Sequence, residues 1–193
     1  MSLVKVLEAT KALHSSNPFL SSFADWPEIF NLNEKSNVNI PATDLVKNFP
    51  LEGSQHTKKI VNVIKENTQF AKWQHTYTEE EVGIDFLNRY GYYELIGTEG
   101  HFQSDNLRAF IAYWGEGLTY DWHSHEAEEL YFVLAGSALF KTQRIEKILR
   151  ANDSCYHRSW ESHSMVTFSE PILTLVLWRG KGLEILSTMD KKA

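Results

Sequence analysis

The sequence predicts a mainly β protein, a sandwich or jelly-roll barrel preceded by a helical extension. In the first half of the 193 residues, apolar side chains recur at helical spacing, whereas from about Tyr92 onward they alternate along the chain. The alternating runs are short and are separated by turns rich in glycine and polar residues, which is typical of an antiparallel barrel. We therefore expect residues 1–95 to form the helical extension and residues 96–193 to form the barrel.

The helical half has four segments with apolar residues at helical spacing. Helices are predicted at residues 4–14, 57–67 and 78–90, with a further turn or two between residues 22 and 31. Thr78 and Glu81 have the spacing of a capping box, and the apolar stripe that follows them ends at Gly91. The helix that begins after Thr78 is the best supported of the set.

The strand-rich half contains runs of β-branched and aromatic residues. Strands are predicted at residues 108–114, 130–140, 165–168 and 172–178. Turn residues lie between them, at 115–117, 152–153 and 169–171.

Composition excludes several classes of protein. The chain is 42% hydrophobic and 13% aromatic, enough for a substantial core, and its net charge of −6 argues against a nucleic-acid partner. Lys5, Glu8, Lys11 and His14 interrupt the apolar residues of the N-terminus, Met1 to Phe19, so neither a leader-like segment nor a membrane span is expected there. Cys155 is the only cysteine, which favours a cytoplasmic location; a periplasmic one is the alternative if a leader has been removed. The oligomeric state is left open, with a homodimer as one alternative.

One motif carries more information than any other part of the chain. Gly117, His123, His125, Glu129 and Gly136 spell G-x5-H-x-H-x3-E-x6-G. Side chains two residues apart share a face of a strand, so a hairpin after His125 would bring both imidazoles and the carboxylate to one side. Two imidazoles and a carboxylate are suitable ligands for one divalent metal.

A further ligand must come from a distant strand. His163, just before an apolar run, is the natural candidate, and His157 is the reserve. This ligand type suits Fe, Mn, Co, Ni or Zn with coordination positions left open, and open positions imply chemistry on a bound molecule. Tyr131 lies two residues after Glu129 and is expected on the same face.

The run from Trp114 to Gly136, WGEGLTYDWHSHEAEELYFVLAG, resembles the first motif of the cupin superfamily and, more closely, the bacterial cupin-type dimethylsulfoniopropionate (DMSP) lyases of the DddQ type. The resemblance implies a cupin double-stranded β-helix, that is, a jelly-roll barrel. The second cupin motif departs from the usual pattern. Its glycine, proline, glycine and asparagine positions hold Asn152, Arg158, Trp160 and Thr167, and only His163 matches. We interpret this as local variation of the turns.

The resemblance also implies a carbon–sulfur lyase. It would cleave DMSP, a small zwitterion, by β-elimination to dimethyl sulfide and acrylate, using one divalent transition metal held by His123, His125, Glu129 and His163. Tyr131 is predicted to be the catalytic base. Tyr120 and Trp178 match aromatic positions of the family's substrate pocket and would attract the sulfonium by cation–π contacts.

Two other functions stay open at this stage. A cupin dioxygenase would use ferrous iron on the same ligands to act on a small organic acid. A non-catalytic cupin would only bind a small ligand; cupins of this kind often carry a DNA-binding helix, and the first 95 residues lack a basic recognition helix.

Overall fold

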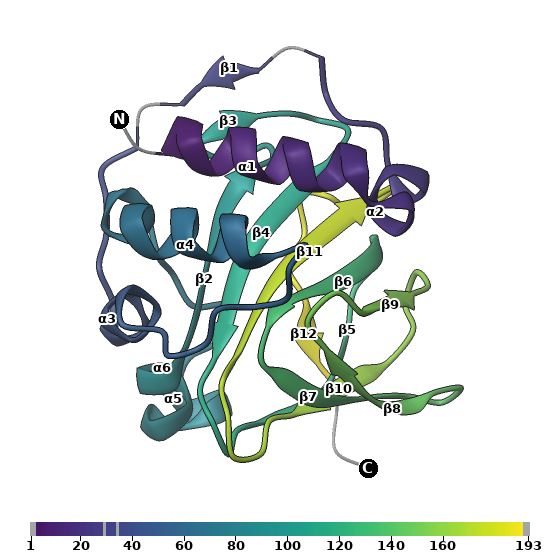
Figure 1. The fold of residues 1–193 in the computed structure, drawn as a ribbon. Helices are drawn as coiled ribbons and strands as arrows, with labels where there is room; N and C mark the ends of the chain where they lie inside the picture. The colour runs from purple at the N-terminus through teal and green to yellow at the C-terminus, as the bar shows by residue number, and fades with distance from the viewer. Residues whose placement is uncertain (1–2, 29, 34, 191–193) are drawn as a thin grey trace.

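The computed structural model describes residues 3–28, 30–33 and 35–190, with helices first and strands after them (Figure 1). The helices are α1 (Leu3–Ser16), α2 (Pro18–Phe23), α3 (Pro41–Lys47), α4 (Lys58–Asn67), the 3₁₀ helix η1 (Thr68–Phe70), α5 (Glu79–Val82) and α6 (Ile84–Arg89). The strands are β1 (Asn31–Leu32), β2 (Tyr90–Ile96), β3 (Phe102–Gln103), β4 (Arg108–Trp114), β5 (Thr119–Ser124), β6 (Glu128–Ala135), β7 (Ser137–Thr142), β8 (Glu146–Arg150), β9 (Ser154–His157), β10 (His163–Val166), β11 (Ile172–Arg179) and β12 (Thr188–Met189).

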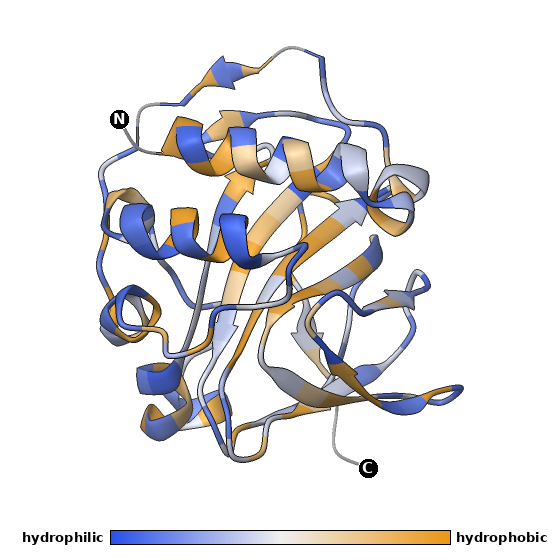
Figure 2. Ribbon diagram, in the orientation of Figure 1, coloured by the Kyte–Doolittle hydropathy of each residue, from blue (hydrophilic) through white to orange (hydrophobic). Residues whose placement is uncertain are grey.

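Two sheets form the barrel, and the helices cover the larger one. The larger sheet has the strand order β1-β3-β2-β4-β11-β6-β9, and the smaller has β12-β5-β10-β7-β8. Helices α1 and α4 lie across β2, β4 and β11 (Figure 1). These helices mix hydrophilic and hydrophobic residues, whereas the strands behind them are mostly hydrophobic (Figure 2). The predicted jelly-roll barrel with an N-terminal helical extension is confirmed.

Side chains alternate between the two faces of the larger sheet, and each face contributes to a separate apolar core. One face packs against the helices, where Val6, Ile64 and Leu95 are fully buried in one apolar cluster. The other face turns into the barrel, where Phe110 and Tyr131 belong to a second cluster. Each fully buried aliphatic side chain contributes about 1.5–3 kcal/mol, so the helical layer stabilises the sheet that carries the site.

The predicted helices are found with changes at their ends. The helix at 57–67 is α4, and the capping box at Thr78 forms, with the Thr78 N–H donating to Glu81 Oε2 at 2.8 Å. The segment predicted as one helix over 78–90 is instead two short helices, because Gly83 adopts φ +81° between them. The predicted boundary after residue 95 lies inside β2, which begins at Tyr90 and pairs with β4.

Among the strands, the run at 108–114 is β4 and the run at 172–178 is β11. The run predicted over 130–140 is two strands, β6 and β7, because Gly136 turns the chain at φ +81°. A Cβ on Gly136 would lie 1.9 Å from the Pro171 carbonyl oxygen, so only glycine fits.

The predicted hairpin between His125 and Glu129 is wrong. Strand β5 belongs to the smaller sheet and β6 to the larger one, so residues 125–127 form a corner between the two sheets. The corner still directs His123, His125 and Glu129 into the barrel, where all three are buried.

Candidate metal centre

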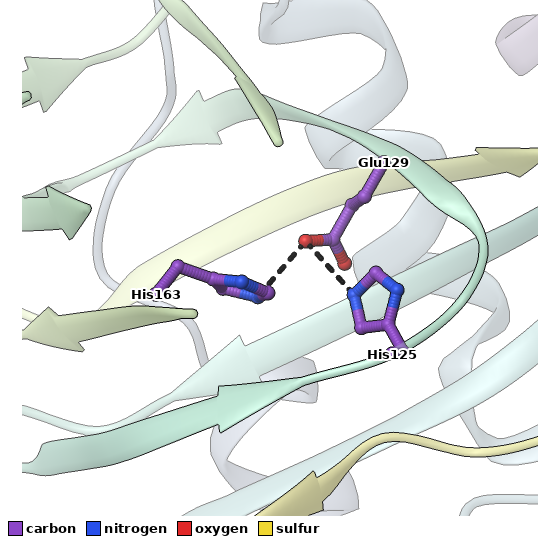
Figure 3. Close-up of side chains that lie close together, drawn as sticks. All are labelled: His125, Glu129 and His163. Carbon is purple, nitrogen blue, oxygen red and sulfur yellow. Dashed lines mark ion pairs between the residues drawn. The ribbon is translucent and has the colours of Figure 1, made fainter. Parts of the chain in front are cut away.

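His125, Glu129 and His163 come together inside the barrel from two distant parts of the chain. Their ligand atoms all lie within 4.8 Å of one another. Glu129 Oε2 is 3.4 Å from His125 Nε2 and 3.1 Å from His163 Nε2, and both rings point toward the carboxylate (Figure 3). The three side chains are at most 3% exposed.

Backbone carbonyls orient the two imidazoles. His125 Nδ1 lies 2.9 Å from the Ala127 carbonyl oxygen, and His163 Nδ1 lies 2.8 Å from that of Glu161. A carbonyl oxygen can only accept, so each Nδ1 carries the hydrogen and donates it. In the neutral form of each ring the Nε2 atom then has a free lone pair, and this is the form that binds metals.

These residues fit a divalent metal. His125 Nε2 and His163 Nε2 are buried atoms without a hydrogen-bond partner, although both are within ion-pair distance of Glu129. A buried polar atom left unpaired is costly, and an ion between the two nitrogens and the carboxylate would satisfy all three groups. His125, Glu129 and His163 could thus hold one metal and leave coordination positions open for a ligand.

Two neighbours fix the Glu129 carboxylate. Trp178 Nε1 donates to Oε1 at 2.7 Å, and His157 Nδ1 lies 2.7 Å from Oε2. Burial alone would raise the pKa of Glu129, but the imidazoles of His125 and His163 outweigh it and hold the pKa well below its ordinary value. The carboxylate is therefore ionised, as a metal ligand must be.

The structure places His123 beside the group but not in it. Its ring is stacked on Tyr120 at a centroid distance of 3.8 Å, and its Nδ1 lies 2.8 Å from the Asp121 carbonyl oxygen. Its ring is also 4.0 Å from that of His163, its cross-strand partner. Burial, and then His163, lower the pKa of His123 well below its ordinary value.

The predicted base and both predicted aromatic residues line the same cavity. This cavity, of about 40 Å³, is enclosed mainly by aromatic side chains: Tyr90, Tyr92, Phe110, Trp114, Tyr120, Tyr131 and Trp178. The Tyr131 ring centroid is 5.5 Å from that of His157 and 6.4 Å from that of His163. Burial, and then the Glu129 carboxylate, raise the pKa of Tyr131 well above its ordinary value. Without a counter-charge the phenol is protonated.

Comparison with known proteins agrees with this geometry. Residues 31–174 match the dimethylsulfoniopropionate lyase family. The chain is 35% identical over 176 residues to the dimethylsulfoniopropionate lyase DddQ of Ruegeria pomeroyi, an alignment that covers 91% of this chain and 88% of the relative. The chain belongs to the dimethylsulfoniopropionate lyase family.

Two solved structures of DMSP lyases have the same fold. One, from the crystal structures of RdDddP and RnDddQII, superposes with a TM-score of 0.95 at 38% identity, covering 98% of this chain and 97% of the other. The crystal structure of DddQ from Ruegeria pomeroyi DSS-3 gives a TM-score of 0.92 at 34% identity, covering 97% and 95%. The similarity therefore extends over the helical half as well as the barrel.

Both non-glycine residues at the glycine positions of the altered second motif have the positive φ that glycine favours. Asn152 and Trp160 occupy its two glycine positions, and both adopt positive φ, 79° and 58°. Among the described residues, these are the two with positive φ that are not glycine. His163 follows this turn as the first residue of β10.

Not every aromatic residue of these segments lines the cavity. Tyr113 and Trp114 are adjacent on β4, so Trp114 lines the cavity while Tyr113 packs in the core under the helices. Trp160 is 58% exposed and does not line the cavity.

Sequence reasoning missed three residues around the site. Tyr77, from the loop before α5, hydrogen-bonds the Tyr120 hydroxyl at 2.9 Å and Ser187 Oγ at 2.8 Å. Arg108 and Glu94 form a buried ion pair next to Trp178. Arg108 and Glu94 could have been found from the sequence, because each is a charged residue that interrupts an apolar run. The sequence around Tyr77 contains no comparable signal.

Regarding membranes, none of the helices in the described residues combines the length and the apolar character that crossing a bilayer requires.

Proposed function

We propose that this protein cleaves dimethylsulfoniopropionate by β-elimination, giving dimethyl sulfide and acrylate. The observation that carries the proposal is the group of His125, Glu129 and His163, whose Nε2 atoms face one carboxylate beside an aromatic cavity that His125 and Glu129 line. Relatives that align over nine-tenths of the chain or more are DMSP lyases.

The chemistry explains why such a site is needed. The reaction removes a proton from the carbon next to the DMSP carboxylate, and this proton is only weakly acidic because the carboxylate is already negative. A divalent transition metal, when bound by His125, Glu129 and His163, supplies positive charge that stabilises the enediolate-like charge developing on the substrate carboxylate and favours the phenolate form of Tyr131. Fe, Zn, Mn, Co and Ni all suit this ligand set.

Tyr131 is the proposed base. It lies on β6 two residues after Glu129, so both side chains enter the barrel from the same face of one strand. The Tyr131 oxygen takes the proton from the substrate, the carbon–carbon double bond forms, and dimethyl sulfide leaves with the electron pair of the carbon–sulfur bond. A sulfonium is a good leaving group, so no general acid is required at the sulfur.

The aromatic lining provides the binding site for the sulfonium. A sulfonium has no hydrogen-bond donor, so it is recognised by the faces of aromatic rings, at about 0.5–2 kcal/mol per contact. Tyr120 is a member of this lining and is held by its hydroxyl contact with Tyr77. Trp178 belongs to the same lining.

We do not assign His123 as a ligand. Its ring is stacked on Tyr120, and it lies outside the group of three ligand residues. Since His123 lines the cavity, we propose that it contacts the substrate instead.

We also propose that the protein acts in the bacterial cytoplasm. Support comes from the single cysteine, Cys155, because one cysteine cannot form an intrachain disulfide and nothing in the sequence then points to an oxidising compartment. Fractionation of the source cells with an antibody against the protein tests this location.

The decisive experiment is a product assay. Protein loaded separately with Fe, Mn, Co, Ni and Zn is incubated with DMSP, and headspace dimethyl sulfide and acrylate are measured. We expect release with at least one metal and none from His125→Ala, while His56→Ala, a change at an exposed imidazole far from the barrel interior, behaves as wild type. No release above a heat-killed control with any of the five metals would overturn the proposal.

A further inference from the structure

Trp178 and Glu129 are direct cross-strand partners, on β11 and β6. The indole Nε1 donates to Glu129 Oε1 at 2.7 Å, which leaves Oε2 to face His125 Nε2 and His163 Nε2. The hydrogen bond therefore fixes which oxygen of the carboxylate points at the two imidazoles.

The ring of Trp178 also packs against the imidazole of His125. The His125 ring is stacked on the indole at a centroid distance of 4.1 Å and an interplanar angle of 27°. Together with the Nδ1 contact to the Ala127 carbonyl, this stacking restricts rotation of the His125 ring. One side chain thus orients two of the three residues that could hold the metal.

Little of the indole is left for a substrate cation. Trp178 is 5% exposed, and the guanidinium of Arg108 already lies over the ring, 5.4 Å from its centroid. Arg108 is held there by Glu94 and by its bond to the Leu183 carbonyl oxygen at 2.6 Å. A sulfonium against the same indole would have to share the ring with this fixed cation.

We propose that Trp178 is a positioning residue for Glu129 and His125, and that it is not the aromatic face that binds the sulfonium. The indole N–H is the group that matters most, since it sets the orientation of the carboxylate. The inference rests on the proposed function only for the identity of the substrate cation.

Two substitutions separate the alternatives. Trp178→Phe keeps an aromatic face but loses the N–H, and Trp178→Leu loses both. We expect both variants to bind Zn²⁺ about 10–100-fold more weakly than wild type in a chelator competition, the usual cost of losing a group that orients a metal ligand. With saturating metal, kcat for DMSP should fall while KM changes less than about 2-fold, because only transition-state alignment is lost. Trp122→Phe, a change on the outside of β5, is the matched control and should leave both quantities unchanged.

A spectroscopic measurement distinguishes altered ligand geometry from loss of the fold. The visible absorption of the Co²⁺-loaded protein reports ligand geometry, and it should change in Trp178→Phe while the far-ultraviolet circular dichroism stays as in wild type. The proposal is overturned if Trp178→Phe binds Zn²⁺ and Co²⁺ as wild type does and only Trp178→Leu shows a raised KM. Metal affinity and the cobalt spectrum require no turnover, so they decide this inference even if wild-type protein releases no dimethyl sulfide.

Discussion

His157 Nδ1 lies 2.7 Å from Glu129 Oε2, and the two residues are direct cross-strand partners on β9 and β6. His157 Nε2 is 3.4 Å from Cys155 Sγ. Because an ionised carboxylate only accepts, Nδ1 carries the hydrogen, and Nε2 accepts from the thiol. Burial, and then His163, lower the pKa of His157 to about 4, so the ring is neutral at pH 7 and has this one tautomer.

This arrangement predicts that His157 supports the site by orienting Glu129. In His157→Ala the Oε2 oxygen loses its donor, so we expect Zn²⁺ affinity to fall about 10–100-fold. Cys155→Ser keeps a donor for His157 Nε2 and should bind Zn²⁺ nearly as wild type does. Chelator competition on both variants checks the prediction, and equal affinity of His157→Ala and wild type would contradict it.

Tyr131→Phe tests the base. The variant keeps the ring that packs against Phe140 at 5.3 Å but has no oxygen to accept the proton. We expect kcat for DMSP to fall by about 10²–10⁴-fold, the usual contribution of a positioned general base. Metal content, measured on protein purified without chelator, should stay near that of wild type. Full activity in this variant would place the base on another residue.

The periodic elements could be predicted from the sequence because their signal is local. Apolar residues at helical spacing located α4, and the alternating run from Arg108 to Trp114 located β4. The corner between His125 and Glu129 was predicted as a hairpin, because alternation says which face a side chain occupies but not which sheet its strand joins. Helix α3, seven residues that begin at Pro41, was too short to show a clear period.

The site, too, could be predicted only in part. His125 and Glu129 were found through short spacing in the sequence, and the structure brings His163 to them. The hydrogen bond between Trp178 and Glu129 could not be predicted, because it depends on the register of two strands whose partners lie 49 residues apart. The second motif was hard to recognise because Asn152 and Trp160 adopt positive φ without being glycine.

The buried ion pair between Arg108 and Glu94 is expected to stabilise the fold strongly. The guanidinium donates through Nε to Glu94 Oε1 at 3.0 Å and through Nη2 to Oε2 at 2.8 Å, and both side chains are at most 4% exposed. Glu94→Gln leaves a buried cation without its counter-charge, which should lower the free energy of unfolding by about 3–5 kcal/mol.

A surface pair provides the matched control. Glu99 pairs with Lys35 at 2.9 Å, but its side chain is 78% exposed, so Glu99→Gln should change the free energy of unfolding by less than about 1 kcal/mol. Urea unfolding of both variants measures the difference. If Glu94→Gln is as stable as Glu99→Gln, the buried pair does not have the role assigned to it.

Trp160 has an unfavourable backbone conformation that a substitution can relieve. It adopts φ +58°, where residues other than glycine, asparagine and aspartate are strained by about 1–2 kcal/mol, and its N–H donates to the His125 carbonyl oxygen at 2.8 Å. Because the indole is 58% exposed, its removal costs little packing. We therefore expect Trp160→Gly to be more stable than Trp160→Ala by about 1 kcal/mol in urea unfolding, since both lose the same side chain and only glycine relieves the strain. At the neighbouring exposed Ser159, which does not have positive φ, Ser159→Ala should instead be more stable than Ser159→Gly. Greater stability of Trp160→Ala than of Trp160→Gly would show that the turn before His163 is not strained at this residue.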